Sequence, residues 1–195
     1  MKNRTDKRIE KLTNAIKSRQ PSLTLVLENI HDPHNVSAIF RTCDAAGIPK
    51  VSLIYNVEKF PRIGKKSSAS AFKWVEKEKF KTVEECYSNL KKGGFKIYAS
   101  AISDTAEDLY KLDFTKKAAI VMGNENRGLS NEAIEMADVQ FKIPMIGMVQ
   151  SLNVSVSAAI VIYEALRQRR KNTKFNGSEL TEKQILEMLS QWSEK

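Results

Sequence analysis

The sequence predicts an α/β protein with a mostly parallel sheet flanked by helices, and one helical extension at each end of the chain. Short apolar runs alternate with segments in which apolar residues recur every three or four positions, and this alternation is typical of strands joined by helices. Several runs, such as TLVLE and AAIVMG, are nearly all apolar, as strands are when both faces of the sheet are covered. The 195 residues contain no internal repeat, so we expect one core.

The individual elements follow from the same patterns, and they divide the chain into three parts. Strands are predicted at 23–29, 51–56, 72–80, 95–102, 118–123 and 138–144. Helices are predicted at 1–20, 34–46, 82–92, 130–137, 153–171 and 179–194. The parts are a basic N-terminal helical extension (1–20), a central domain (21–172) and a C-terminal helical extension (173–195).

One stretch, SLNVSVSAAI at 151–160, carries two conflicting patterns. Its first seven residues alternate between polar and apolar, which indicates a strand. However, Asn153 is a good helix N-cap, and a helix from there places Val154, Ala158 and Val161 on one face. Because no turn residue separates the two patterns, we interpret 153–171 as one helix.

The chain is basic, with a formal net charge of +9, and its positive charge is clustered. One cluster lies in residues 1–20, and another contains Lys59, Arg62, Lys65 and Lys66. The third lies at the end of the helix predicted at 153–171 and just beyond it, and consists of Arg167, Arg169, Arg170, Lys171 and Lys174. Such clusters are typical of RNA- or DNA-binding proteins; a merely solvated basic surface is the alternative at this point. The cations predicted to contact RNA are Arg4, Lys7, Arg8, Lys11, Lys17, Arg19, Arg167, Arg169, Arg170 and Lys171.

Several classes of protein are excluded by what the sequence lacks. No apolar run approaches the ~20 residues of a membrane span, and the N-terminus has no apolar signal segment. With Cys43 and Cys86 in helix-like segments, we expect a cytoplasmic protein with reduced thiols, no membrane association and no metal. Leu129 stands where a phosphate-binding loop needs Lys, which argues against an NTPase.

Three predicted strands end in unusual residues, and ligands of open α/β sheets bind beyond the carboxyl ends of the strands. The first end leads through Asp32–Pro33 into a helix on which Arg41 lies off the apolar stripe. Arg41 could form an i,i+3 surface ion pair with Asp44, or it could have a functional role. The second end is VMGNENRGLS, a glycine turn presenting Glu125, and the third is the loop that leads to Asn153.

Together, NVSAIFRTCDAAG, VMGNENRGLS and IPMIGMVQSLNVSVSAAI resemble, in order and spacing, the three signature motifs of the knotted SPOUT methyltransferases of the TrmH type. With the basic N-terminal helix and the C-terminal helix included, the resemblance to the tRNA guanosine-2′-O-methyltransferase subgroup extends over nearly the whole chain. It implies a deep trefoil knot at about 118–165, an exception to the rule that chains do not thread loops. It also implies a homodimer, in which the terminal helices contribute affinity for tRNA.

The resemblance further implies S-adenosylmethionine as the cofactor and the ribose 2′-hydroxyl of a guanosine in the tRNA D-loop, position eighteen, as the methyl acceptor. The implied cofactor-binding residues are Ser100, Ala101, Gly123, Ile143 and Leu152. The implied catalytic positions are Asn35, Arg41, Glu125, Ser151 and Asn153.

Within these positions, Arg41 would be the general base, assisted by a substrate phosphate, or a bidentate clamp on that phosphate. Asn35 would orient Arg41 and the ribose, and each site would take its Arg41 from the partner chain. Two alternatives stay open: the same fold acting on ribosomal RNA or the wobble nucleotide of tRNA, and an RNA-binding protein without catalytic activity. The intact set of catalytic positions argues against the second.

Overall fold

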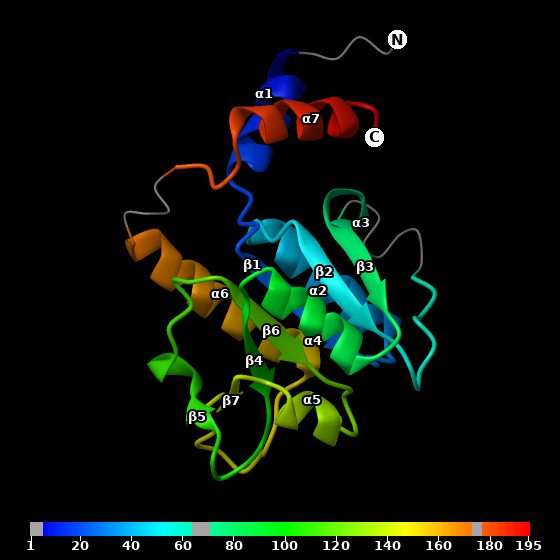
Figure 1. Ribbon diagram of the computed structural model, residues 1–195, viewed down its shortest axis with the longest axis vertical. Coiled ribbons are helices and arrows are strands. Elements are labelled where there is room, and N and C mark those ends of the chain that lie inside the picture. The colour runs from blue at the N-terminus through cyan, green and yellow to red at the C-terminus, as the bar shows by residue number, and fades with distance from the viewer. Residues whose placement is uncertain (1–5, 64–70, 173–176) are drawn as a thin grey trace.

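The computed structural model describes residues 6–63, 71–172 and 177–195, so Arg4, Lys65, Lys66 and Lys174 lie outside the described residues. Within these ranges a seven-stranded sheet has the order β3-β2-β1-β6-β4-β7-β5, and each pair of neighbouring strands is parallel. The predicted mostly parallel sheet flanked by helices is confirmed (Figure 1).

The elements follow one another along the chain with these bounds. They are α1 (Asp6–Lys17), β1 (Leu23–Glu28), α2 (Pro33–Ala45), β2 (Lys50–Ile54), α3 (Ala71–Trp74), β3 (Glu76–Phe80), α4 (Val83–Lys92), β4 (Lys96–Ser100), β5 (Glu107–Asp108), the 3-10 turn η1 (Leu109–Lys111), β6 (Ala118–Met122), α5 (Asn131–Glu135), β7 (Val139–Lys142), α6 (Val154–Lys171) and α7 (Glu182–Ser193).

Helices cover both faces of the sheet, and this explains why every residue of β1 and β6 is buried and nearly all of them are apolar. α2 and α6 pack on one face, where the predicted stripe Val36, Ile39, Phe40 and Cys43 is fully buried. α4 and α5 pack on the other face (Figure 1). Burying a large apolar side chain of this kind stabilises the fold by about 1.5–3 kcal/mol. Both cysteines are buried and free.

The ambiguous stretch at 151–160 is helical from Val154, as predicted. The side chain of Asn153 caps the helix by accepting a hydrogen bond from the backbone N–H of Ser155 at 2.8 Å. The strand predicted at 72–80 is only half right, because Ala71–Trp74 forms a helical turn that stacks Phe72 on Phe40 with 4.3 Å between ring centroids. The short strand β5 and the η1 turn were not predicted.

The two terminal helices pack against each other at one end of the molecule (Figure 1). Leu12 and Ile16 of α1 form a small apolar cluster with Trp192 of α7. The first helix therefore has a packing role that its mostly polar sequence did not predict. Arg19 follows α1 and connects this pair of helices to the core, because its guanidinium pairs with Asp44 at 2.5 Å and lies over the Trp192 ring.

Arg169 is the most deeply placed charged side chain of the core, and its exposed fraction is 0%. Its guanidinium donates to the carbonyl oxygens of Phe114, Ser22 and Lys116 at 2.8, 3.0 and 2.7 Å. It also forms an ion pair with Glu179 at 3.3 Å. Arg169 thus joins the start of β1, the loop before β6 and the segment that leads to α7.

Two kinds of feature are absent from the described residues. No described helix is both long enough and apolar enough to cross a membrane. Likewise, no described group of three or more His, Cys, Asp or Glu side chains could hold a metal ion.

Candidate active site

The carboxyl ends of the central strands bring most of the predicted cofactor-binding residues together. In the register of the sheet, Ala99 of β4 pairs with Val121 of β6, and Ser100 pairs with Phe141 of β7. The residues one or two positions after these pairs therefore lie at one edge of the sheet, and they include Ala101, Gly123 and Ile143. Leu152 comes from the loop before α6, and 36% of its surface is exposed.

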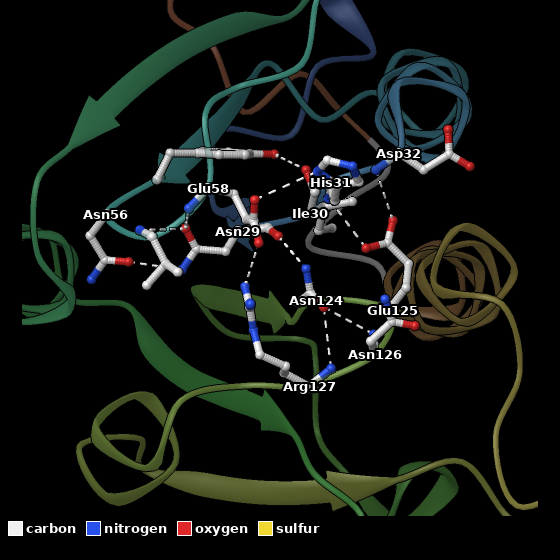
Figure 2. Close-up of polar contacts among 12 residues, drawn as sticks. Asn29, Ile30, His31, Asp32, Asn56, Glu58, Asn124, Glu125, Asn126 and Arg127 are labelled. Carbon is white, nitrogen blue, oxygen red and sulfur yellow. Dashed lines mark hydrogen bonds and ion pairs between the residues drawn. The ribbon is translucent and has the colours of Figure 1, made fainter.

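A chain of hydrogen bonds connects the three motifs. The side-chain amide of Asn35 donates to a carboxylate oxygen of Glu125 at 2.8 Å. The side-chain amide of Asn153 donates in turn to the amide oxygen of Asn35 at 3.0 Å. Glu125 also accepts hydrogen bonds from the backbone N–H groups of His31 and Asp32 (Figure 2). The first turn of α2, the loop after β6 and the cap of α6 are thereby held in one arrangement.

The loop after β6 is fixed by Asn124, whose role was not predicted. The amide of Asn124 donates to the carbonyl oxygen of Asn29 at 2.7 Å, and its oxygen accepts from the backbone N–H groups of Asn126 and Arg127 (Figure 2). Asn29 has a φ of 52°, in the left-handed region that Asn tolerates better than most residues. A strand that ends in Asn was the only signal for this arrangement in the sequence.

Gly123 is required by the backbone around it. A Cβ at this position would lie 2.4 Å from the carbonyl carbon of Gly128 and from the backbone nitrogen of Leu129. At the far end of the loop, the carboxylate of Glu28 accepts from the backbone N–H and the hydroxyl of Ser130 at 2.9 and 2.6 Å. The shape of the loop therefore depends on a missing side chain at its start and on a buried carboxylate at its end.

Arg41 is exposed and separate from the hydrogen-bonded chain of its own protomer. Its guanidinium forms no ion pair or hydrogen bond with the described residues, and Asp44 pairs with Arg19 instead. Six residues of helix place Arg41 about 9 Å along the axis and roughly 120° around it from Asn35. The predicted contact in which Asn35 orients Arg41 is therefore not made within one chain.

Ser151 and the apolar residues around it lie mostly in the open. Ser151 is exposed and forms no hydrogen bond with any described residue. Ile146 and Met148 are fully exposed, and Val149 is 61% exposed. The structure therefore brings together three of the five predicted catalytic positions, and Arg41 and Ser151 remain outside the hydrogen-bonded chain.

Two of the predicted RNA contacts are contradicted by burial. Arg19 is 2% exposed and Arg169 is 0% exposed, and both guanidinium groups are directed into the protein. The sequence alone does not show whether a charged side chain is exposed and free to bind RNA, or is buried and connects parts of the protein. The other predicted RNA contacts among the described residues are exposed, and they are Lys7, Arg8, Lys11, Lys17, Arg167, Arg170 and Lys171.

A groove of about 800 Å³ lies at the opposite end of the sheet, between the end of α1, the end of α2 and the end of α6. The C-terminal ends of α2 and α6 carry the negative ends of their helix dipoles. The buried cations Arg19 and Arg169 lie beside these ends, and each forms an ion pair with an acidic side chain. None of the predicted catalytic or cofactor-binding residues lines this groove.

The edge that carries the motifs suits a cofactor held through backbone groups. Ala101, Gly123, Ile143 and Leu152 bring small or apolar side chains and no charge, which fits the purine and sulfonium of S-adenosylmethionine better than a nucleotide phosphate. Tyr55 is near this edge. Burial raises the pKa of its hydroxyl, and the negative charge of Glu125 raises that pKa further. Its hydroxyl therefore stays protonated and donates to the carbonyl oxygen of Ile30 at 3.0 Å.

The parallel sheet and the three motifs joined at its carboxyl edge define the class as SPOUT-type methyltransferases of the TrmH kind. The chain belongs to the SpoU rRNA Methylase family, whose model matches residues 22–163.

Individual relatives are similar over nearly the whole chain. The tRNA (guanosine(18)-2′-O)-methyltransferase of Thermus thermophilus is 40% identical over 195 residues, which is 100% of both chains. The Escherichia coli enzyme of the same name is 41% identical over 163 residues, 84% of this chain and 71% of that one. A crystal structure of the A. aeolicus TrmH/SpoU tRNA modifying enzyme matches with a TM-score of 0.90 at 36% identity, covering 97% of this chain and 96% of that one.

Proposed function

We propose that this protein transfers a methyl group from S-adenosylmethionine to the ribose 2′-hydroxyl of guanosine eighteen in the D-loop of tRNA. The observation that carries the proposal is the hydrogen-bonded chain Asn153–Asn35–Glu125, which joins the three motifs at the carboxyl edge of the sheet. The full-length similarity to the Thermus thermophilus enzyme supports the choice of nucleotide. As a tRNA-modifying enzyme, the protein would act in the cytoplasm.

The cofactor would be held by Ser100, Ala101, Gly123, Ile143 and Leu152. When bound, S-adenosylmethionine supplies an electrophilic methyl group. The protein must then place the 2′-oxygen in line with that methyl, since such positioning can lower the barrier by several kcal/mol. Asn35 and Glu125 fix the start of α2 against the cofactor loop, so they act in this proposal as the frame of the pocket. Ser151 would hold the loop next to Leu152.

Arg41 would meet the RNA, because it is exposed and its guanidinium is unpaired among the described residues. It would take the proton of the 2′-hydroxyl with help from a substrate phosphate, or clamp that phosphate bidentately. Arg41→Ala should then lower kcat by about 10²–10⁴-fold and leave the affinity for S-adenosylmethionine unchanged. Arg41→Lys should also be severely impaired, because a point charge does not replace a planar fork.

We propose a homodimer in which each site receives Arg41 from the partner chain. α6 exposes an apolar stripe in which Val156 is 47% and Tyr163 is 51% exposed, with Ile160 half-buried between them. Such a stripe on a helix that already buries its other face supports a second copy as its partner. The distance along α2 between Asn35 and Arg41 supports the exchange, because one chain does not bring them together.

The borrowing of Arg41 can be tested with two inactive variants. Arg41→Ala and Asn153→Ala chains, co-expressed with different affinity tags and purified as heterodimers, should have one intact site and about half of the wild-type rate. An inactive heterodimer would contradict the exchange, and a monomer in sedimentation at micromolar concentration would contradict the dimer.

The reaction itself is tested with an unmodified tRNA transcript and labelled S-adenosylmethionine. Ribose methylation should map to guanosine eighteen, and a transcript with adenosine at that position is the matched control. Methylation at the wobble nucleotide, or only on ribosomal RNA, would replace the proposed substrate by one of its alternatives. Label on a base, or on no RNA, would overturn the proposed function.

A further inference from the structure

We propose that the α2-side face of strand β3 binds the phosphate backbone of the tRNA substrate beside the active site. We call this region the β3 surface and define it by its four cations, Lys59, Arg62, Lys77 and Lys79. The inference rests on the proposed function, since it takes the RNA to be the substrate tRNA. Only Lys59 and Arg62 stood out in the sequence; the sequence EKEKF of β3 reads simply as an alternation of charges.

The register of the sheet places the two lysines of β3 on the same face as α2. Lys77 pairs with Val51, and Lys79 pairs with Leu53. Val51 and Leu53 belong to the core cluster that α2 and α6 cover. Because side chains alternate along a strand, Glu76 and Glu78 point to the opposite face, which α4 covers.

The charges of β3 are therefore segregated by sign. Glu78 forms an ion pair with Lys50 at 2.7 Å, so the acidic face is partly neutralised. The four cations of the β3 surface are exposed, and none of them forms an ion pair with a described acid. Lys77 and Lys79 share one face of β3, and Lys59 and Arg62 are exposed in the loop after β2. Exposed cations without acidic partners among the described residues are complementary to a polyanion.

Aromatic rings support the cations and connect them to α2. The ammonium of Lys77 lies 5.0 Å from the centroid of the Phe72 ring, and that of Lys79 lies 5.9 Å from the Phe60 ring. Phe72 stacks on Phe40, the residue before Arg41. Because each ring lies within cation–π distance of a lysine ammonium, it restrains that long side chain and reduces the entropy lost when the ammonium binds a phosphate.

The β3 surface also borders the active-site edge. The Tyr55 ring packs edge-on against Phe60 with 5.1 Å between centroids, and the Tyr55 hydroxyl donates to Ile30 beside the Glu125 contacts. Glu58, which lies between Tyr55 and Phe60 in the loop after β2, forms an ion pair with Arg127 of the loop after β6 at 2.8 Å (Figure 2). Lys77 and Lys79 of β3, and Lys59 and Arg62 of the loop before it, therefore offer further cations to an RNA strand near this edge.

A second reading of the lysines is that they protect an edge strand from pairing with another chain. Charges of either sign, on either face of β3, would be enough to protect this edge strand from pairing with another chain. This reading predicts that removing the lysines promotes self-association and does not change tRNA binding. The two readings therefore differ in a measurable quantity, the salt dependence of tRNA affinity.

The test uses the double variant Lys77→Gln/Lys79→Gln in the full chain. The control Lys92→Gln/Lys111→Gln removes the same charge from two exposed lysines that have no ion pair with any described residue. Lys92 lies on α4, at the other face of the sheet, and Lys111 lies beside β5, at its other edge. The dissociation constant for unmodified tRNA is measured over a range of salt concentrations, together with KM for tRNA, KM for S-adenosylmethionine, and the melting temperature.

The β3 variant should bind tRNA at least about tenfold more weakly at low salt, and its slope of log affinity against log salt should flatten by just under 2. KM for tRNA should rise while KM for S-adenosylmethionine and the melting temperature stay at wild-type values. An unchanged slope, an equal loss in the control, or self-association with normal tRNA binding would overturn the proposal. Failure of the wild-type protein to methylate any tRNA would instead overturn the proposed function, so the two failures are distinguishable.

Discussion

Replacing Arg169 by Met should destabilise the protein strongly and leave its electrostatic attraction to tRNA almost unchanged. The guanidinium donates to three backbone carbonyl oxygens, and it also contacts the Ser22 hydroxyl at 2.8 Å and Glu179 at 3.3 Å. Methionine fills a similar volume but offers no donor. The carbonyl oxygens of Phe114, Ser22 and Lys116 would each lose a buried partner.

The size of the effect follows from these contacts. Removing one member of a buried, hydrogen-bonded ion pair costs about 3–5 kcal/mol, because the remaining polar groups stay buried without partners. For a chain of this length, each kcal/mol lowers the melting temperature by about 2–4 °C. Arg169→Met should therefore melt roughly 6–20 °C below the wild type.

Arg170→Met is the matched control, since Arg170 is the next residue, is exposed and has no ion pair among the described residues. Its effect on the free energy of unfolding should stay within about 0.5 kcal/mol. If Arg170 binds a phosphate of the tRNA, its replacement should flatten the salt slope by just under ~1. Thermal unfolding followed by circular dichroism, and tRNA titrations well below both melting temperatures, measure the two quantities. A stable Arg169→Met variant with a flattened salt slope would refute the assignment of Arg169 as a brace.

Three further outcomes follow from the site and from α6. Gly123→Ala should lower both the melting temperature and the affinity for S-adenosylmethionine, because its Cβ would meet the Gly128 backbone at 2.4 Å; wild-type cofactor affinity in calorimetry would contradict this. Glu125→Gln should lower the melting temperature by about 3–12 °C, because at least one of the hydrogen bonds accepted by the carboxylate is lost, and methyl transfer should fall with it; full activity would contradict the frame role. Hydrogen bonding from Arg167 lowers the pKa of Glu164 below its usual value of 4.5. Its contribution to stability is therefore complete above that pH and is lost as pH falls through the lowered pKa; Glu164→Gln should flatten this acid-side decline in pH-dependent melting.

The parts of the fold that sequence patterns predicted are those set by local periodicity. The apolar spacing from Val36 to Cys43 defined the buried face of α2, and the cap at Asn153 decided between strand and helix for the start of α6. Phe72 was wrongly included in the strand predicted at 72–80, because aromatic residues that directly precede a strand are themselves typical of strands. Its helical turn depends on a stacking partner, Phe40, that is distant in sequence.

The candidate site was predictable only in its residues, not in its contacts. Asn35, Glu125 and Asn153 stood out as motif positions, but the hydrogen bonds between them join residues 90 and 118 positions apart. Burial of charge was equally hidden: Arg169 and Arg170 are adjacent and identical in type, and only the packing of α6 separates a brace from a surface cation. The trefoil knot stays a prediction.

The place of β1 in the middle of the sheet has a consequence for synthesis on the ribosome. One edge of β1 pairs with β2, the next strand in the chain, but its other edge pairs with β6, which leaves the ribosome roughly 90 residues later. At about 5–20 residues per second, an apolar strand edge stays open for roughly 5 to 20 seconds. During that interval the nascent chain presents TLVLE as a template for pairing with other chains. We therefore expect slowed translation between β2 and β6, or depletion of chaperones, to reduce the soluble yield of this protein more than substitutions at its active site do.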